Sequence, residues 1–142
     1  MNARAARAVL VVAVAAATAG CASLRESAAA SRCAADAQSM VQETLYFGTQ
    51  TPDGSVTPAQ WSQFLAETVT PRFPQGLSVW PASGQWRGTD GSIAREASYV
   101  LTLLHGDDPA SDAAVRAIAD DYRRRFRQEA VMRVRAPACV SF

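Results

Sequence analysis

Apolar residues recur along the chain at two different spacings, which separate predicted strands from predicted helices. Residues 41–50 (VQETLYFGTQ) alternate between apolar and polar side chains and are rich in β-formers, so they predict a strand. We expect three more strands, at 76–88, 93–105 and roughly 129–135, and the turn signal TDGS joins the middle two into a hairpin. Pro81 places its strand at a sheet edge or a bulge, because proline donates no ladder hydrogen bond.

Two segments between these strands have helical spacing and clear start signals. Thr57 is a predicted N-cap, Pro58 suits the first helical position, and Gln60 completes a capping box. Asp108 and Pro109 begin a second helix by the same logic. The apolar stripes are Trp61, Phe64, Leu65 and Thr68/Val69 in the first helix and Val115, Ile118, Tyr122 and Phe126 in the second.

The resulting order of elements is β-α-β-β-α-β. Two βαβ crossovers around a central hairpin predict an α+β fold of the ferredoxin-like kind, a two-layer sandwich. It consists of a four-stranded antiparallel sheet with both helices on one face. The other face of such a sheet is left open, as a dimer interface, a ligand platform or a solvated surface.

The first twenty residues have the layout of an export signal. Arg4 and Arg7 give a cationic start, and the apolar run at 8–20 has thirteen residues, whereas a membrane-spanning helix needs about 20. Small residues precede Cys21, which resembles a bacterial lipobox, although Thr18 stands where leucine is usual. The resemblance implies diacylglycerol on the Cys21 sulfur and acylation of its amino group. The alternative is an ordinary secretory signal with Cys21 incidental.

We therefore expect a lipoprotein signal peptide at 1–20, a lipidated cysteine (palmitate among its chains) with a flexible tether at 21–40, and a single α+β domain at 41–142. Several acyl chains anchor a protein stably, so the membrane is an expected partner. Ala22 follows the cysteine in place of the aspartate that commonly retains lipoproteins in the inner membrane. The expected location is the cell envelope, facing the periplasm, with the outer membrane favoured.

Three cysteines are an odd number for an exported chain. If Cys21 carries lipid, Cys33 and Cys139 remain as a pair in an oxidising compartment, which predicts a disulfide between them. Closing a loop of roughly 100 residues would stabilise the fold by about 4–5 kcal/mol in the chain-entropy model. The alternative is two unpaired buried thiols.

The charge balance excludes one class of partner. All 14 basic residues are arginine, and without the first twenty residues 12 arginines face 13 acids, a net charge of about −1. Such a domain has no net field to attract nucleic acid, and we expect none as a partner.

The hairpin segment GQWRGTDGSIAREASYV (84–100) holds most of the candidate ligand-binding residues. Arg87, Arg95 and Glu96 lie near Trp86 in the sequence, a combination that suits a carboxylate-bearing ligand on arginine forks and an aromatic shelf. The competing interpretation is a solvated hairpin with cross-strand ion pairs.

Tyr46 is a further ligand-binding candidate. If Leu45 and Phe47 belong to the core, strand alternation puts Tyr46 on the open face, where its hydroxyl could meet a ligand or the ring could merely pack.

His105 is the single histidine and precedes two aspartates, Asp107 and Asp108. A general-base or metal-ligand role is conceivable, but Asp108 is already a helix cap and no third ligand follows at a suitable spacing. We expect no metal and no cofactor, and the motifs assign no catalytic residue.

The run DDYRRRFR (120–127) resembles a basic patch, but acidic residues lie one helical turn from its arginines. Opposite charges lie four residues apart, which predicts a self-paired, solvated helix face. The pairs are Arg116–Asp120, Asp120–Arg124 and Asp121–Arg125.

Several segments together resemble a known family of small bacterial secreted proteins. ETLYFG, TPRFPQGLSVWPASGQWR, REASYVLTLLH and the terminal CVSF are similar to domain-of-unknown-function family 3574, over residues 43–142. The resemblance implies an exported, often lipidated domain and brings no reaction, substrate or cofactor.

Two classes of function stay open. The preferred one is a non-enzymatic envelope lipoprotein that binds a small molecule or an envelope protein through the open sheet face, with a homodimer through that face as one form. The alternative is a small cofactorless enzyme that uses Arg87, Arg95, Glu96 and Tyr46 on a carboxylate-bearing small molecule.

Overall fold

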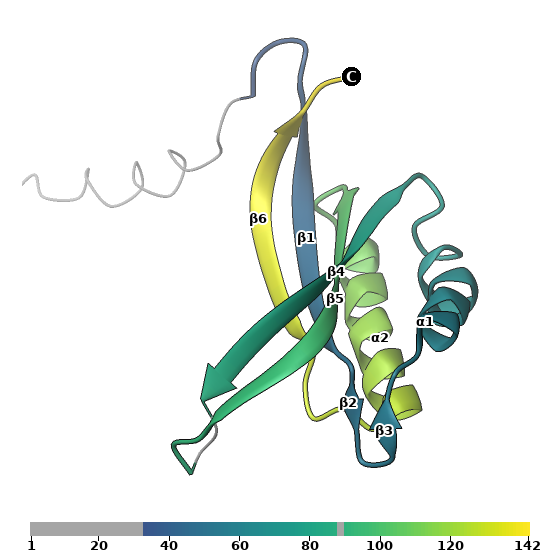
Figure 1. Cartoon of the computed structure of the whole chain (residues 1–142). Helices are drawn as coiled ribbons and strands as arrows, with labels where there is room; N and C mark the ends of the chain where they lie inside the picture. The colour runs from purple at the N-terminus through teal and green to yellow at the C-terminus, as the bar shows by residue number, and fades with distance from the viewer. Residues whose placement is uncertain (1–32, 88–89) are drawn as a thin grey trace, which may run out of the picture. The chain divides into compact units, whose positions relative to one another are not determined.

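The predicted order of strands and helices is observed in the computed structural model, which describes residues 33–87 and 90–142 (Figure 1). Two short strands form an additional small hairpin after the first long strand. The elements are β1 (Gln38–Gly48), β2 (Gln50–Thr51), β3 (Gly54–Ser55), α1 (Pro58–Phe64), η1 (Leu65–Val69), β4 (Leu77–Arg87), β5 (Ile93–His105), α2 (Pro109–Phe126) and β6 (Met132–Val140).

The four long strands form one antiparallel sheet in the order β4-β5-β1-β6. Both helices lie on the same side of this sheet (Figure 1), so the ferredoxin-like two-layer sandwich is confirmed. β4 and β6 are the edges, and each contains a proline, Pro81 and Pro137, that an edge strand tolerates. The last strand extends to Val140, five residues beyond its predicted end.

The helix starts follow the predicted chemistry. The Thr57 hydroxyl accepts from the Gln60 backbone N–H at 3.2 Å, and the Gln60 side chain accepts from the Thr57 N–H at 2.9 Å. Asp108 caps α2 by accepting from the Ser111 N–H at 2.8 Å. α1 continues into the π-helical η1, which ends at Val69 shortly before Pro71.

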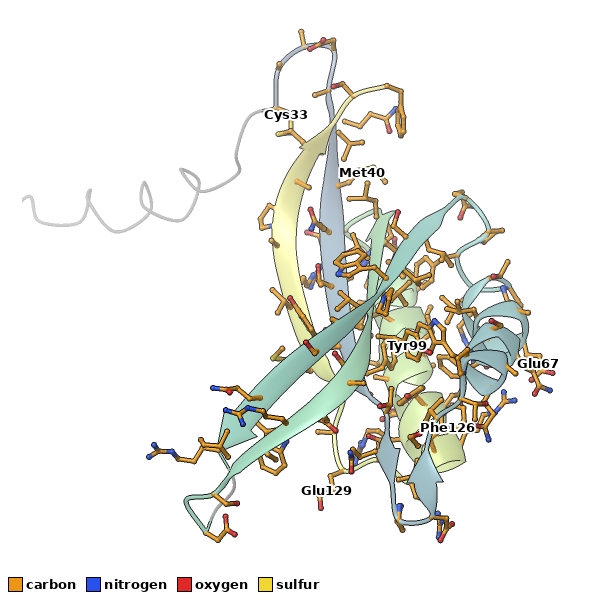
Figure 2. All side chains as sticks on the ribbon, in the orientation of Figure 1. Cys33, Met40, Glu67, Tyr99, Phe126 and Glu129 are labelled. Carbon is orange, nitrogen blue, oxygen red and sulfur yellow. A yellow bond between two sulfur atoms is a disulfide. The ribbon has the colours of Figure 1, made fainter. Side chains whose placement is uncertain are left out.

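The core lies between the sheet and the helices. Leu45 and Phe47 of β1 are completely buried there, as is Tyr122 of α2. The Phe47 and Tyr122 rings meet edge-on with their centroids 4.7 Å apart, and the Trp61 and Tyr99 rings stack with their centroids 4.5 Å apart. Tyr99 is labelled in Figure 2, where it lies between the two layers. The predicted stripe of α2, Val115, Ile118, Tyr122 and Phe126, is buried throughout.

The predicted disulfide is present. Cys33 and Cys139 are joined, with their Cα atoms 5.4 Å apart and 106 positions apart in the sequence. This bond ties the segment before β1 to the end of β6, and β1 itself begins at Gln38, three residues before the expected start of the domain. Cys21 and the expected signal peptide lie outside the described residues. Within the described part of the chain, no helix is both long and apolar enough to cross a membrane.

The arginines of α2 are paired, but with other partners than those predicted. Three pairs lie within the helix and two cross to neighbouring residues, because the side chains reach the nearest acid in space. The observed pairs are Arg116–Asp112, Arg123–Asp120, Arg124–Asp121, Arg125–Glu67 and Arg72–Asp121.

Candidate binding site

Strand register places three of the predicted ligand-binding residues on the open face of the sheet. Tyr46 of β1 pairs with Val100 of β5, and Trp86 of β4 pairs with Ala94 of β5. Ala94, Glu96 and Val100 are separated by even numbers of residues and therefore lie on the same face of β5. Antiparallel partners share a face, and side chains alternate along a strand, so all of these residues point away from the helices.

These three residues line one pocket of about 600 Å³ at the end of the open face. A volume of this size is typical of small-molecule sites, at about 300–1,000 Å³. The other walls come from β2 and from the segment between α2 and β6. The lining residues are Tyr46, Gly48, Gln50, Thr51, Pro52, Trp86, Glu96, Arg127, Gln128, Glu129, Ala130 and Met132.

Glu96 is half-buried in this pocket, next to the backbone of β1. A Cβ atom at Gly48 would lie 3.0 Å from Glu96 Oε1 and 3.2 Å from Gln128 Oε1, so Gly48 leaves the space that both side chains occupy. Within residues 33–87 and 90–142, the Glu96 carboxylate forms no hydrogen bond or ion pair. The Glu96 carboxylate therefore faces the pocket without a bonded partner in this part of the chain.

Another wall of the pocket is built by an unusual helix end. Arg127 terminates α2 in the left-handed conformation, with φ 51° and ψ 43°, and its N–H donates to the Arg123 carbonyl. A non-glycine residue rarely adopts this conformation. The Arg127 guanidinium pairs with Asp53 of the β2–β3 turn, and the Gln128 amide donates to the Gln50 carbonyl. The Arg127 guanidinium at the pocket wall thus has an acidic partner, whereas the Glu96 carboxylate has none among the described residues.

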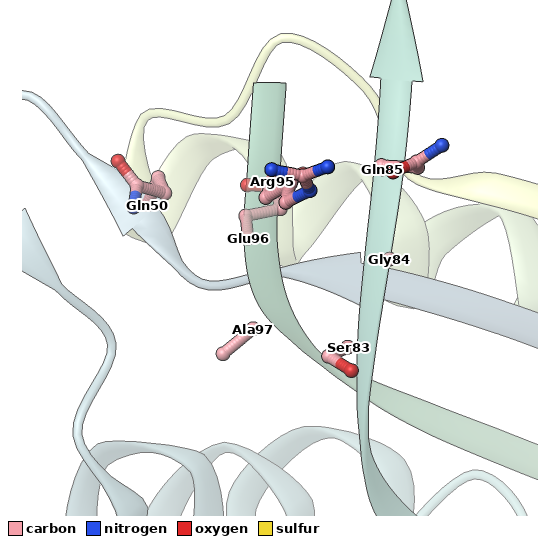
Figure 3. A pocket seen from close by; sticks show the side chains of 7 residues that line it. All are labelled: Gln50, Ser83, Gly84, Gln85, Arg95, Glu96 and Ala97. Atoms are coloured by element: carbon pink, nitrogen blue, oxygen red, sulfur yellow. The ribbon is translucent and has the colours of Figure 1, made fainter. Parts of the chain in front are cut away.

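The two arginines of the predicted site do not join this pocket. Arg95 points to the other face of β5 and lines a second pocket of about 550 Å³, shown in Figure 3 with Ser83, Gln85 and Glu96. Arg87 lines neither pocket. The structure therefore brings Tyr46, Trp86 and Glu96 into one pocket that neither Arg87 nor Arg95 lines, whereas Arg95 shares the second pocket with Glu96.

Sequence reasoning missed Glu43, which is fully buried on the helix-covered face. Its carboxylate accepts from Arg133 Nε at 2.7 Å and lies 3.3 Å from His105 Nε2. Arg133 also donates to Asp112 of α2 at 2.7 Å. The signal was available, because Glu43 falls on the same strand face as Leu45 and Phe47.

The pKa values in this cluster follow from its hydrogen bonds. The bond to Glu43 raises the pKa of Arg133 above its usual range, and Asp112 adds to the effect. The bond from Arg133 in turn lowers the pKa of Asp112 below 3.8. The cluster is thus a set of mutually satisfied charges.

His105 belongs to the same cluster and not to the pocket. It is buried, and its Nδ1 is 2.5 Å from the Gly106 carbonyl. Asp107 pairs with Arg135, and Asp108 caps α2. Among the described residues, no three His, Cys, Asp or Glu side chains form a group that could hold a metal ion.

Comparison with known proteins identifies a family and a set of structural neighbours. Residues 42–142 match the family model "Protein of unknown function (DUF3574)". A phage SAM lyase in complex with S-methyl-5'-thioadenosine is 14% identical, covering 78% of this chain and 94% of the lyase, with a TM-score of 0.56. The apo form of a phage SAM lyase is 16% identical, covering 72% and 89%, with a TM-score of 0.52.

CutA from Synechococcus elongatus is 13% identical, covering 72% of this chain and 80% of CutA, with a TM-score of 0.49. No curated protein matches the chain. At these identities the likeness to the lyases concerns the fold alone.

Proposed function

The chain belongs to the DUF3574 family of proteins of unknown function, and we propose from its geometry that it is a non-enzymatic binding domain of the cell envelope. Its ligand is a small organic cation with an apolar body. The observation that carries this proposal is the half-buried Glu96 carboxylate, which has no described protein partner and shares its pocket with Trp86 and Tyr46.

The pocket chemistry supports a cation. A carboxylate that loses part of its hydration favours a positively charged partner, and the face of an indole ring attracts the same charge. Met132 supplies an apolar wall on the same side of the sheet, and the Tyr46 hydroxyl and the Gln128 amide can hydrogen bond. A ligand with an ammonium or guanidinium group on an apolar body matches all of these groups.

The alternative of a cofactorless enzyme acting on a carboxylate-bearing molecule receives less support. That reaction would use Arg87 and Arg95 as the carboxylate fork, and neither lines the pocket that contains Tyr46. An anionic ligand would instead meet Glu96 at close range.

The sequence and one covalent bond support the proposed location. Anchoring through lipid on Cys21 would hold the domain at the periplasmic side of the envelope, at the outer membrane by the Ala22 rule. The Cys33–Cys139 disulfide supports an oxidising compartment. Labelling with radioactive palmitate tests this part: the native chain incorporates label and Cys21→Ser does not. Equal labelling of both proteins would contradict the lipid assignment.

Thermal denaturation with a ligand panel tests the binding function. The panel contains tryptamine, benzyltrimethylammonium and agmatine, with indole-3-acetate and benzoate as anionic counterparts. At 100 times its dissociation constant a cation stabilises the fold by about 2.7 kcal/mol, and the melting temperature rises by about 10 °C.

Glu96→Gln should abolish this rise. The matched control is Glu67→Gln, because Glu67 lies on η1 and lines neither pocket described above. A response to the anions that equals the response to the cations, or a full response in Glu96→Gln, would disprove the proposed ligand class.

A further inference from the structure

The open face of the sheet has almost no charge. Strand register assigns to it alternate residues of all four long strands, and among these positions Glu96 is the only acidic or basic residue. Several large side chains on this face are at least one-third exposed. They are Tyr46, Trp80, Trp86, Met132 and Val134.

This composition is that of a protein interface. The cores of such interfaces are depleted in charged residues and enriched in tyrosine, tryptophan and methionine. Surfaces that bind anionic membranes or nucleic acid combine apolar residues with lysine or arginine. The open face has neither basic residue at any of its strand positions.

The hairpin of β4 and β5 points to the same conclusion. Its outer half extends beyond the helix layer (Figure 1), and Trp86 on its open side is 53% exposed. A two-stranded ribbon without a covering layer is only marginally stable in water. A second molecule packed on its open side would supply the missing layer.

We propose that the occupant of this face is a second copy of the same chain. Two identical faces related by a two-fold axis place apolar side chains against apolar side chains, and the face contains no charge that needs an opposite partner at its centre. Glu96 lies toward the hairpin end of β5, at the edge of this contact and away from its centre, and it lines the pocket there.

The area is sufficient for a stable dimer. The four strands have 9 to 13 residues each. At about 3.3 Å along the strand and about 4.8 Å between strands, the face covers about 700 Å² per copy. Two copies would bury about 1,400 Å² in total, within the range of specific interfaces. This inference goes beyond the ligand pocket, although Tyr46, Trp86 and Met132 belong to both surfaces.

Sedimentation equilibrium of the full chain, in detergent matched to the solvent density, tests the proposal. The test variants are Trp80→Glu and Val134→Glu, because both residues lie on the open face and line none of the pockets described above. Ile93→Glu is the matched control, since Ile93 is as exposed as Val134 but faces the helix side.

At micromolar concentration the native chain and Ile93→Glu should have twice the mass of one chain. Each test variant should raise the dissociation constant at least tenfold. Two variants on different strands keep the test decisive if one fails to fold. A native chain that stays monomeric at 100 μM, or that reaches multimers only by binding another protein or lipid vesicles, would overturn the proposal.

The two proposals can fail separately. Val134→Glu should lose the dimer and keep the cation response, whereas Glu96→Gln should lose the cation response and keep the dimer. If each of the two variants lost both the dimer and the cation response, the assignment of dimer contacts to residues outside the pocket would be overturned.

Discussion

Glu43 and Glu96 are carboxylates on opposite faces of one sheet, and their surroundings differ completely. Glu43 is buried under the N-terminal part of α2, where Arg133 and His105 lie within hydrogen-bonding distance of its oxygens. Glu96 lies on the uncovered face, and no described residue bonds to its carboxylate. The carboxylate on the helix side is bonded within the fold, whereas the carboxylate on the open side has no bonded partner among the described residues.

The same contrast holds for aromatic residues. Phe47 touches Trp61, Phe64 and Tyr122 in the core. Tyr46, the preceding residue, faces away from the helices and is 36% exposed. Two consecutive residues thus face opposite sides of the sheet, Phe47 into the core and Tyr46 toward solvent. The helix-covered face maintains the structure, and the open face leaves side chains exposed.

The largest loss of stability should come from a substitution in the core on the helix-covered side of the sheet. Phe47→Ala removes a completely buried ring and should lower the free energy of unfolding by about 3–5 kcal/mol. Tyr46→Ala should lower it by less than about 1.5 kcal/mol, because much of its ring is already in contact with water. Urea denaturation at low protein concentration, where any dimer is dissociated, measures both values. Equal losses would mean that the open face is as tightly packed as the core.

The second comparison exchanges each carboxylate for an amide. Glu43→Gln leaves Arg133 without its main buried counter-ion and should cost about 3 kcal/mol in unfolding free energy. Glu96→Gln should change stability by less than about 0.5 kcal/mol without ligand, since no described pair is broken. Guanidinium denaturation of both variants provides the measurement. A destabilisation by Glu96→Gln that matches that of Glu43→Gln would show that Glu96 has a structural role.

The fold was predictable because each element carried its own local signal. The capping box at Thr57, the Asp108–Pro109 start and the alternation around Leu45 each depend on a few neighbouring residues, and two helices and four strands in that order allow few topologies. The Cys33–Cys139 pair followed from counting cysteines.

The site was only partly predictable because its walls come from distant segments. Tyr46, Trp86 and Glu96 were identified from strand alternation and the hairpin, and the structure brings them into one pocket. Gln128 was missed, because its place depends on Arg127 adopting a left-handed conformation that arginine rarely takes. Arg87 and Arg95 were grouped with Glu96 as one candidate site, although strand alternation already predicts that Arg95 and Glu96 face opposite sides.

The smallest effect concerns Asp112, the outermost acid of the covered cluster. Its hydrogen bond from Arg133 lowers its pKa in the folded state below 3.8, so the unfolded chain binds a proton more readily. Its contribution to stability is therefore complete above about pH 5 and is lost as the pH falls through the folded-state pKa. Asp112→Asn should make the drop in urea midpoint between pH 7 and pH 3 smaller than in the native chain. Because each protein is compared with itself, any loss that is independent of pH cancels. An unchanged drop would mean that the Arg133–Asp112 contact does not couple protonation to folding, and that the charges on the covered side stabilise the fold through Glu43 alone.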